Sequence, residues 1–177
     1  MQMVALLRGV MPTGKNRISS MAYLAEILAD AGFRGVRTYI QSGNILLDTD
    51  LSPAETAAVI HDTILSRIGA DLFVILKTRE QLAAASSENP FGEGYDQSRI
   101  HLTFTNDLVD AAKIKAMEET KFDCEKFVCG SECFYLYLPR GAANRVLYSG
   151  YLEKRLTIRC TTRKLSVVAR LCELADE

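Results

Sequence analysis

Residues 36–48, VRTYIQSGNILLD, have the pattern of a complete β-hairpin, around which the rest of the predicted fold is arranged. Residues 36–41 alternate between two faces, with Val36 and Ile40 on one and polar side chains on the other, which is the period of a strand. Ser42-Gly43-Asn44 is turn chemistry, and residues 45–48 return as the partner strand. The stretch therefore predicts two neighbouring antiparallel strands.

The segments on either side of this hairpin complete a familiar order. An apolar run at residues 4–8 predicts a first strand, and residues 20–31 predict a helix with one apolar stripe. After the hairpin, a helix begins at Ser52 with a capping box that Glu55 completes, and residues 72–77 predict a fourth strand. The order β-α-β-β-α-β is that of the ferredoxin-like fold, an antiparallel sheet with two helices on one face.

The second half of the chain nearly repeats this order. Its patterns predict a helix at 79–87, a strand at 100–105, a helix at 108–120, a hairpin of 122–129 with 134–138, a helix at 143–155, a strand at 157–160 and a helix at 162–175. We therefore expect an α+β fold of duplicated ferredoxin-like (βαββαβ) halves, with antiparallel sheets and helices packed on them. Residues 1–78 would form the first half. Residues 79–177 would form a βαββα half with extra N- and C-terminal helices, and the two would pack as one compact unit.

Composition indicates a folded protein without membrane spans. Hydrophobic residues make up 48% of the 177 residues, enough for a packed core, and no run of eighteen apolar residues is present. The N-terminus enters a strand pattern at once, without a basic leader, so we expect a cytoplasmic protein. The five cysteines lack zinc-site spacing, so we expect free thiols, no metal and no cofactor.

The net charge of −1 is unevenly distributed along the chain. Residues 1–47 carry a balance of +3, residues 48–144 a balance of −7, and residues 145–177 again +3. If the two basic ends meet in space, they make a local positive field. Nucleic acid is an unlikely partner because the basic segments are short and the whole chain is nearly neutral.

The glycine-rich loop after the first strand invites a nucleotide-binding interpretation. Residues 9–16 fit the pattern G-x-x-x-x-G-K, but Asn16 stands where a phosphate-binding loop has the Ser or Thr that holds magnesium. The hairpin that follows also differs from the parallel crossover of that fold. The loop still places Lys15 and Arg17 just before a helix N-terminus, a position that attracts anions. A solvated basic turn is the alternative interpretation.

Two further features have weaker functional signals. Arg37, Tyr39 and Gln41 are expected on the helix-free face of the predicted sheet. Related folds bind ligands on that face, but a paired aromatic platform is absent here. His101 has no orienting carboxylate or nucleophile near it in sequence, so a structural role is favoured. His61 lies beside the apolar stripe of its helix and is favoured as structural too.

Several motifs, taken in order and spacing, resemble an uncharacterised and mostly bacterial family, domain of unknown function 1697. They are Leu6–Val10, Gly14–Arg17, Arg37–Asn44, Asn89–Phe91, Leu152–Leu156 and Thr161–Arg163. The resemblance covers nearly the whole chain and implies a ferredoxin-related α+β fold, but no agreed activity. The chain departs from the family at residues 10–14, where members read INVGG, and at residues 164–167, where they continue NWNT.

The leading hypothesis is a binding site for a small anion, such as a phosphate-bearing metabolite or nucleotide, where the first loop, the hairpin turn and the basic C-terminal segment converge. Its candidate ligand-binding residues are Arg8, Lys15, Asn16, Arg17, Arg37, Tyr39, Ser42, Asn44 and Arg163. One alternative is a protein-interaction or dimerisation module without catalysis, including a homodimer. Another is a phosphoryl-type enzyme on the same site, for which the sequence identifies no catalytic residue.

Overall fold

A computed structural model describes residues 1–177. The chain divides into two compact units, which are Met1–Arg79 with Ala175–Glu177 (the first unit) and Glu80–Leu174 (the second unit). The first contains β1 (Gln2–Arg8), α1 (Met21–Asp30), β2 (Arg34–Tyr39), β3 (Asn44–Asp48), α2 (Pro53–Ile68) and β4 (Phe73–Thr78). No helix in either unit combines the length and apolar character that crossing a bilayer requires.

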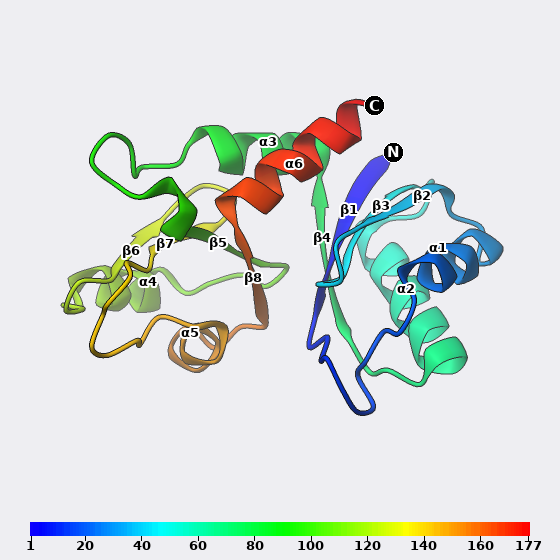
Figure 1. The fold of residues 1–177 in the computed structure, drawn as a ribbon, viewed down its shortest axis with the longest axis horizontal. Coiled ribbons are helices and arrows are strands. Elements are labelled where there is room, and N and C mark those ends of the chain that lie inside the picture. Colours follow the sequence, from blue (N-terminus) through cyan, green and yellow to red (C-terminus); the bar gives the residue numbers. More distant parts are fainter. The chain divides into compact units, whose positions relative to one another are not determined.

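The sheet of the first unit has the strand order β2-β3-β1-β4, with every neighbouring pair antiparallel. Figure 1 shows α1 and α2 together on one face of this sheet. The core lies between these layers, where alternate strand residues such as Ala5, Leu7 and Leu47 meet Leu28 of α1 and Ile64 of α2. Alternation along each strand and the apolar stripe of each helix together specify this face.

The helix α2 begins as its sequence predicts. The Ser52 hydroxyl accepts a hydrogen bond from the backbone N–H of Glu55, whose carboxylate accepts one from the Ser52 N–H, so both halves of the capping box are present. At the other end Gly69 takes the left-handed conformation that closes a helix.

The sheet face opposite α1 and α2 is apolar at its centre. Arg8, Arg37 and Tyr39 project toward this face at its margin, as the strand register dictates. Its central side chains, however, are Val4, Leu6, Leu46 and Ile75, none more than 1% exposed.

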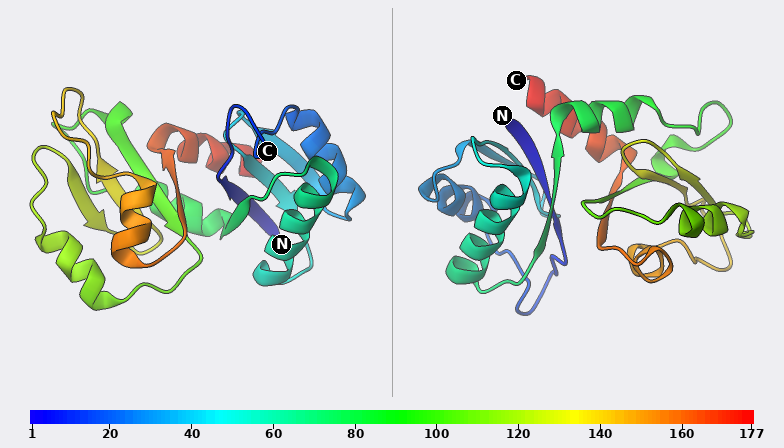
Figure 2. Two further views of the ribbon diagram at one scale, coloured as in Figure 1. Left: turned by 90° about the horizontal axis from the view of Figure 1, so that it is seen from below. Right: turned by 180° about the vertical axis from the view of Figure 1, so that it is seen from behind.

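The second unit repeats the topology. It contains α3 (Arg79–Ser87), the short 3₁₀ helix η1 (Gln97–Arg99), β5 (Ile100–Thr105), α4 (Ala111–Glu119), β6 (Lys126–Cys129), β7 (Phe134–Tyr137), α5 (Ser149–Leu156), β8 (Cys160–Lys164) and most of α6 (Leu165–Asp176). The strand order β6-β7-β5-β8 corresponds to that of the first sheet. Figures 1 and 2 show α4 and α5 on one face and α3 and α6 on the other. The predicted α+β fold of duplicated ferredoxin-like halves is confirmed.

The last elements begin later in the chain than the sequence predicts. The helix expected at 143–155 starts at Ser149, because the backbone N–H groups of Val146 and Leu147 donate to the Glu125 carboxylate instead of entering a helix. The strand expected at 157–160 is Cys160–Lys164, because Thr157 adopts a left-handed conformation that ends α5. The helix expected at 162–175 consequently starts at Leu165.

The hairpin turn of the first unit is pressed against β1. The backbone N–H of Leu7 donates to the Gly43 carbonyl oxygen at 2.8 Å, and Gly43 has a φ of +79°. A Cβ on Gly43 would lie 2.7 Å from the Leu7 Cβ and 3.0 Å from Val10 Cγ2. Only glycine fits this turn, both for its conformation and for its space.

We therefore predict that Gly43→Ala destabilises the protein by about 3 kcal/mol, since strain at positive φ and overpacking against Leu7 add. Gly14→Ala is the matched control, because Gly14 has a φ of +82° but nothing within 4 Å of the place that a Cβ would occupy. It should cost only about 1 kcal/mol. Urea unfolding measures both values, and equal losses for the two variants would contradict the packing argument.

Candidate functional site

The loop after β1 is held in a fixed shape by Asn16. Its side-chain Nδ2 donates to the Asp71 carbonyl oxygen at 3.2 Å, and the Asp71 backbone N–H donates back to Asn16 Oδ1 at 3.1 Å. Within the loop, the Met11 N–H donates to the Asn16 carbonyl oxygen at 2.9 Å. The asparagine that replaces the Ser or Thr of a phosphate-binding loop thus ties the loop to the start of β4.

Lys15 and Arg17 remain available on this loop. Both side chains are exposed, and neither takes part in an ion pair. The helix that follows starts at Met21, after its N-cap Ser20, so the lysine lies several residues before the first helical turn. This spacing differs from a phosphate-binding loop, in which the helix begins at the lysine.

The turn at residues 40–43 lies beside this loop. Gly43 packs on Leu7 and Val10, and the Gln41 side chain donates to the Ile18 carbonyl oxygen at 3.5 Å. Two of the three segments that the sequence analysis combined, the first loop and the hairpin turn, are therefore neighbours in the first unit.

Asn44 shapes the turn from inside. It is fully buried, and its Nδ2 donates to the Tyr39 carbonyl oxygen at 2.9 Å and to the Ser42 hydroxyl at 3.0 Å. These bonds hold Ile40 at a φ of +50°, a conformation that β-branched residues rarely adopt. Asn44 is thus committed to the hairpin, and Ser42 accepts one of its two bonds.

The other candidate cations have partners or lie apart. Arg37 Nη1 lies 3.9 Å from the Glu177 carboxylate, and Arg8 is half-buried at the end of β1. Arg163 belongs to β8 of the second unit, where its guanidinium donates to the Thr161 hydroxyl at 2.7 Å and to the Thr162 carbonyl oxygen at 3.0 Å. Burial lowers the pKa of Arg163 to about 10.

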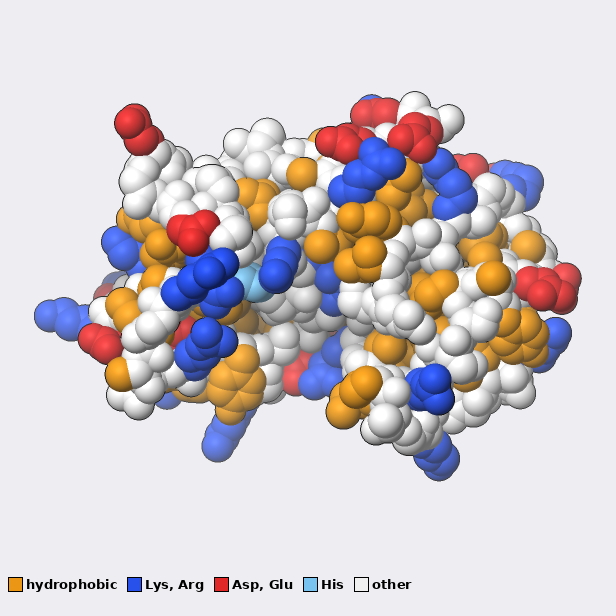
Figure 3. Space-filling view, viewed as in Figure 1, with side chains coloured by type: hydrophobic (Ala, Val, Ile, Leu, Met, Phe, Trp, Pro, Cys, Tyr) orange, Lys and Arg blue, Asp and Glu red, His pale blue; other side chains and the backbone are white.

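A second group of basic side chains, which the sequence analysis did not assemble, lies in the second unit around His101. Lys164 is the residue directly opposite His101 in the β5–β8 pair, so both side chains leave the same face. The charges that act on His101 are those of Arg99, Lys164 and Arg145, and all three disfavour its protonated form. We call Arg99, His101, Arg145 and Lys164 the basic cluster. Figure 3 shows Lys and Arg side chains gathered on this half of the molecule.

A row of hydroxyl groups continues from the basic cluster along the same sheet face. Thr103 Oγ1 and Thr162 Oγ1 are 2.8 Å apart, and Thr162 Oγ1 lies 3.0 Å from Ser149 Oγ. Ser149 is the first residue of α5, whose N-cap Tyr148 contributes no side-chain hydrogen bond. The start of α5 therefore lies next to the row that leads to His101.

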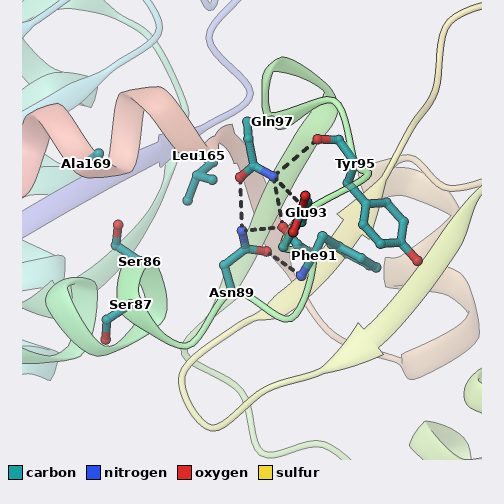
Figure 4. Close-up of a pocket in the computed structure, with 10 residues that line it drawn as sticks. Ser86, Ser87, Asn89, Phe91, Glu93, Tyr95, Gln97, Leu165 and Ala169 are labelled. Atoms are coloured by element: carbon teal, nitrogen blue, oxygen red, sulfur yellow. Dashed lines mark hydrogen bonds between the residues drawn. The ribbon is translucent and has the colours of Figure 1, made fainter.

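A pocket with different chemistry lies between α3, the loop 88–99 and α6 (Figure 4). It encloses about 600 Å³, and the side chains that line it include Ser86, Asn89, Glu93, Gln97 and Leu165. The amides of Asn89 and Gln97 are used within the loop, where Gln97 Nε2 donates to the Phe91 carbonyl oxygen at 2.9 Å. With one carboxylate and no cation in its lining, this pocket does not fit an anion.

The remaining ionisable groups form no further site. No cluster of three or more His, Cys, Asp or Glu side chains could hold a metal ion, and all five cysteines are free. His61 lies between two carboxylates, with Nδ1 3.0 Å from Asp62 Oδ1 and Nε2 2.9 Å from Asp71 Oδ1. Hydrogen bonds to Asp62 and then to Asp71 raise the pKa of His61.

The two histidines should therefore titrate in opposite directions from a free imidazole. The pKa of His61 is raised by its carboxylates, whereas burial, followed by neighbouring cations, lowers the pKa of His101. NMR titration of the imidazole resonances between about pH 5 and 8, around the free value of about 6.5, measures both. Asp71→Asn should lower the pKa of His61 and leave that of His101 in place. A His101 that titrates above His61 in the wild type would contradict these surroundings.

Comparison with known proteins agrees with the fold and assigns no activity. The solved structure described as "The structure of conserved bacterial protein SP0830 from Streptococcus pneumoniae" matches with a TM-score of 0.78 and 21% identity, over 99% of this chain and 98% of that chain. No curated protein matches. A family model described as "Protein of unknown function (DUF1697)" matches residues 1–135, a span that ends before α5 and β8. The chain therefore belongs to the DUF1697 family.

Proposed function

We propose that the chain binds a small anion, such as a phosphate-bearing metabolite or nucleotide, at the loop 9–19 of the first unit. The observation that carries this proposal is the exposure of Lys15 and Arg17, neither in an ion pair, on a loop fixed by Asn16. Cations held in place without a carboxylate partner bind an anion at a lower entropic cost than mobile ones.

Preorganisation supports the proposal. The loop is tied to β4 through Asn16 and to the hairpin turn through Gln41, so its backbone does not need to order when a ligand arrives. The αL conformation of Gly14 and the following backbone bond from Arg17 N–H to the Gly14 carbonyl oxygen at 3.3 Å turn the chain between the two cations. Lys15 supplies a point charge and Arg17 a planar fork of donors.

The other candidate residues take different roles in this proposal. Asn16 and Asn44 shape the loop and the turn, since their amide groups are already hydrogen-bonded to the chain. Arg8, Arg37, Tyr39 and Ser42 border the same region of the first unit and remain proposed contacts. Arg163 receives no role, because its guanidinium is buried and bonded to its own strand.

The two alternative functions remain predictions. A dimerisation module would use apolar side chains such as Met11 and Ile40, which are 54% and 46% exposed on the loop and the turn. A phosphoryl-type enzyme would need a proton acceptor or nucleophile at the loop. The first unit's histidine, His61, is engaged with Asp62 and Asp71 instead.

Phosphate should raise the unfolding temperature of the wild-type protein more than chloride at equal ionic strength. At about ten times its Kd, a ligand stabilises the folded state by about 1.4 kcal/mol. Lys15→Gln combined with Arg17→Gln should reduce this gain, because the charges that attract the anion are removed.

Lys121→Gln combined with Lys154→Gln is the matched control, since it removes two exposed lysines elsewhere on the surface. Thermal unfolding of all three proteins in phosphate and in chloride gives the comparison. Equal phosphate responses of the two double variants would refute binding at the loop.

A further inference from the structure

The basic cluster in the second unit concentrates positive charge around His101. Arg145 and Lys164 are exposed, and neither forms an ion pair. Arg99 Nε donates to the Leu138 carbonyl oxygen at 2.7 Å, which fixes the side chain, and the Asp96 carboxylate lies within electrostatic range of its charge. Four basic side chains, from η1, β5, β8 and the segment before α5, therefore lie near one another, and no acid is among the charges that act on His101.

His101 has one ring nitrogen without a hydrogen-bond partner. Its Nδ1 lies 3.2 Å from the Arg99 carbonyl oxygen, which can only accept, so Nδ1 carries the hydrogen. The Nε2 atom has no partner in the structure. Protonation at Nε2 would add a second N–H donor to the group, beside Lys164 in the paired strand.

Each element that carries the cluster is anchored. Glu125 is 4% exposed and accepts hydrogen bonds from the Val146 N–H at 2.6 Å and the Leu147 N–H at 3.3 Å, which fixes the segment that carries Arg145. His101 and Lys164 lie two residues along their strands from Thr103 and Thr162, about 7 Å away on the same face. Thr162 contacts Ser149 at the start of α5, whose first N–H groups have no acceptor within the helix.

We propose that the basic cluster is a second anion site, which takes a compact, doubly charged tetrahedral oxyanion, either inorganic phosphate or the terminal group of a phosphate monoester. Arg99, Arg145 and Lys164 neutralise the charge, and the Ser149 hydroxyl with the start of α5 adds uncharged donors. A tetrahedral ion has oxygens in several directions, so it can accept hydrogen bonds from donors that come from different segments of the chain. The pocket of Figure 4, with one carboxylate and no cation in its lining, offers no such set. This site is independent of the loop 9–19 and needs none of its residues.

His101 makes the site sensitive to pH. The charged groups that act on it are Arg99 from η1, Lys164 from β8 and Arg145 from the segment before α5, and its neighbour in β7 is the apolar Leu136. Their repulsion disfavours the imidazolium in the empty site, and a bound anion removes that repulsion. By linkage, the anion raises the pKa of His101, and acid strengthens anion binding.

Sulfate tests the site, because it remains divalent between about pH 5.5 and 8 and any pH dependence then belongs to the protein. Calorimetric titration of the full chain should show tighter sulfate binding at the lower pH, and NMR should show a raised pKa of His101 in sulfate. Arg145→Gln combined with Lys164→Gln should weaken binding at least about tenfold, since charged hydrogen bonds are lost. His101→Gln should keep binding but lose its pH dependence.

Lys15→Gln combined with Arg17→Gln is the control, and it should leave the sulfate effect on His101 unchanged. Both pairs of residues are exposed, so circular dichroism should show the wild-type fold in each variant. Methyl phosphate distinguishes a phosphate monoester from inorganic phosphate as the ligand. If it binds as tightly as inorganic phosphate, the site accepts a monoester; if it does not bind, the ligand is the free ion. A His101 pKa that sulfate does not move, or sulfate affinity that Arg145→Gln with Lys164→Gln leaves intact, would overturn the proposal.

Discussion

The close contact between the hairpin turn and the first strand is the constraint on which the first unit depends. The Gly43 carbonyl oxygen accepts a hydrogen bond from the Leu7 N–H, and the missing side chain of Gly43 is what lets the two backbones approach. This contact fixes the register in which Leu6 faces Asn44, so Asn44 is buried and its amide holds the turn. A slip by one residue would move the whole β3 pattern to the wrong face.

The same contact determines what the family-like motif does. The segment 37–44 is specific in sequence, which suggests a ligand site, but its buried asparagine and its glycine build a turn. This turn also supports the loop 9–19, because the Gln41 side chain donates a hydrogen bond to the Ile18 carbonyl oxygen. Lys15 and Arg17 are the exposed cations of that loop, and the buried or hydrogen-bonded residues around them determine where the loop lies. The buried asparagine and the glycine of segment 37–44 therefore determine the shape of the turn, and they affect ligand binding through that shape.

Sequence patterns were reliable where a local signal was complete. The capping box at Ser52 and Glu55 formed as predicted. The hairpin within residues 36–48 also formed, but its first strand ends at Tyr39 instead of Gln41, since Ile40 enters the turn and Asn44 already pairs with Tyr39. The predicted start of α5 was wrong, because the Glu125 carboxylate, about twenty residues earlier, binds the backbone N–H groups of Val146 and Leu147 and keeps them outside the helix. The basic cluster was missed for a similar reason. Lys164 and His101 meet through a strand register that periodicity does not encode, and Thr161-Thr162-Arg163 lacks the apolar alternation that marks a strand.

The two units use one topology with different chemistry at corresponding helices. In the first, α2 starts with its donors satisfied by Ser52 and Glu55; in the second, α5 starts at Ser149 without such a cap, beside cations. In both units, we infer, cations without ion-pair partners on well-anchored segments bind oxyanions. A crystal soaked in selenate, whose selenium scatters anomalously, tests it directly. We expect anomalous peaks within hydrogen-bond reach of Lys164 with His101 and of Lys15 with Arg17. A well-diffracting crystal with no peak at either place would contradict it.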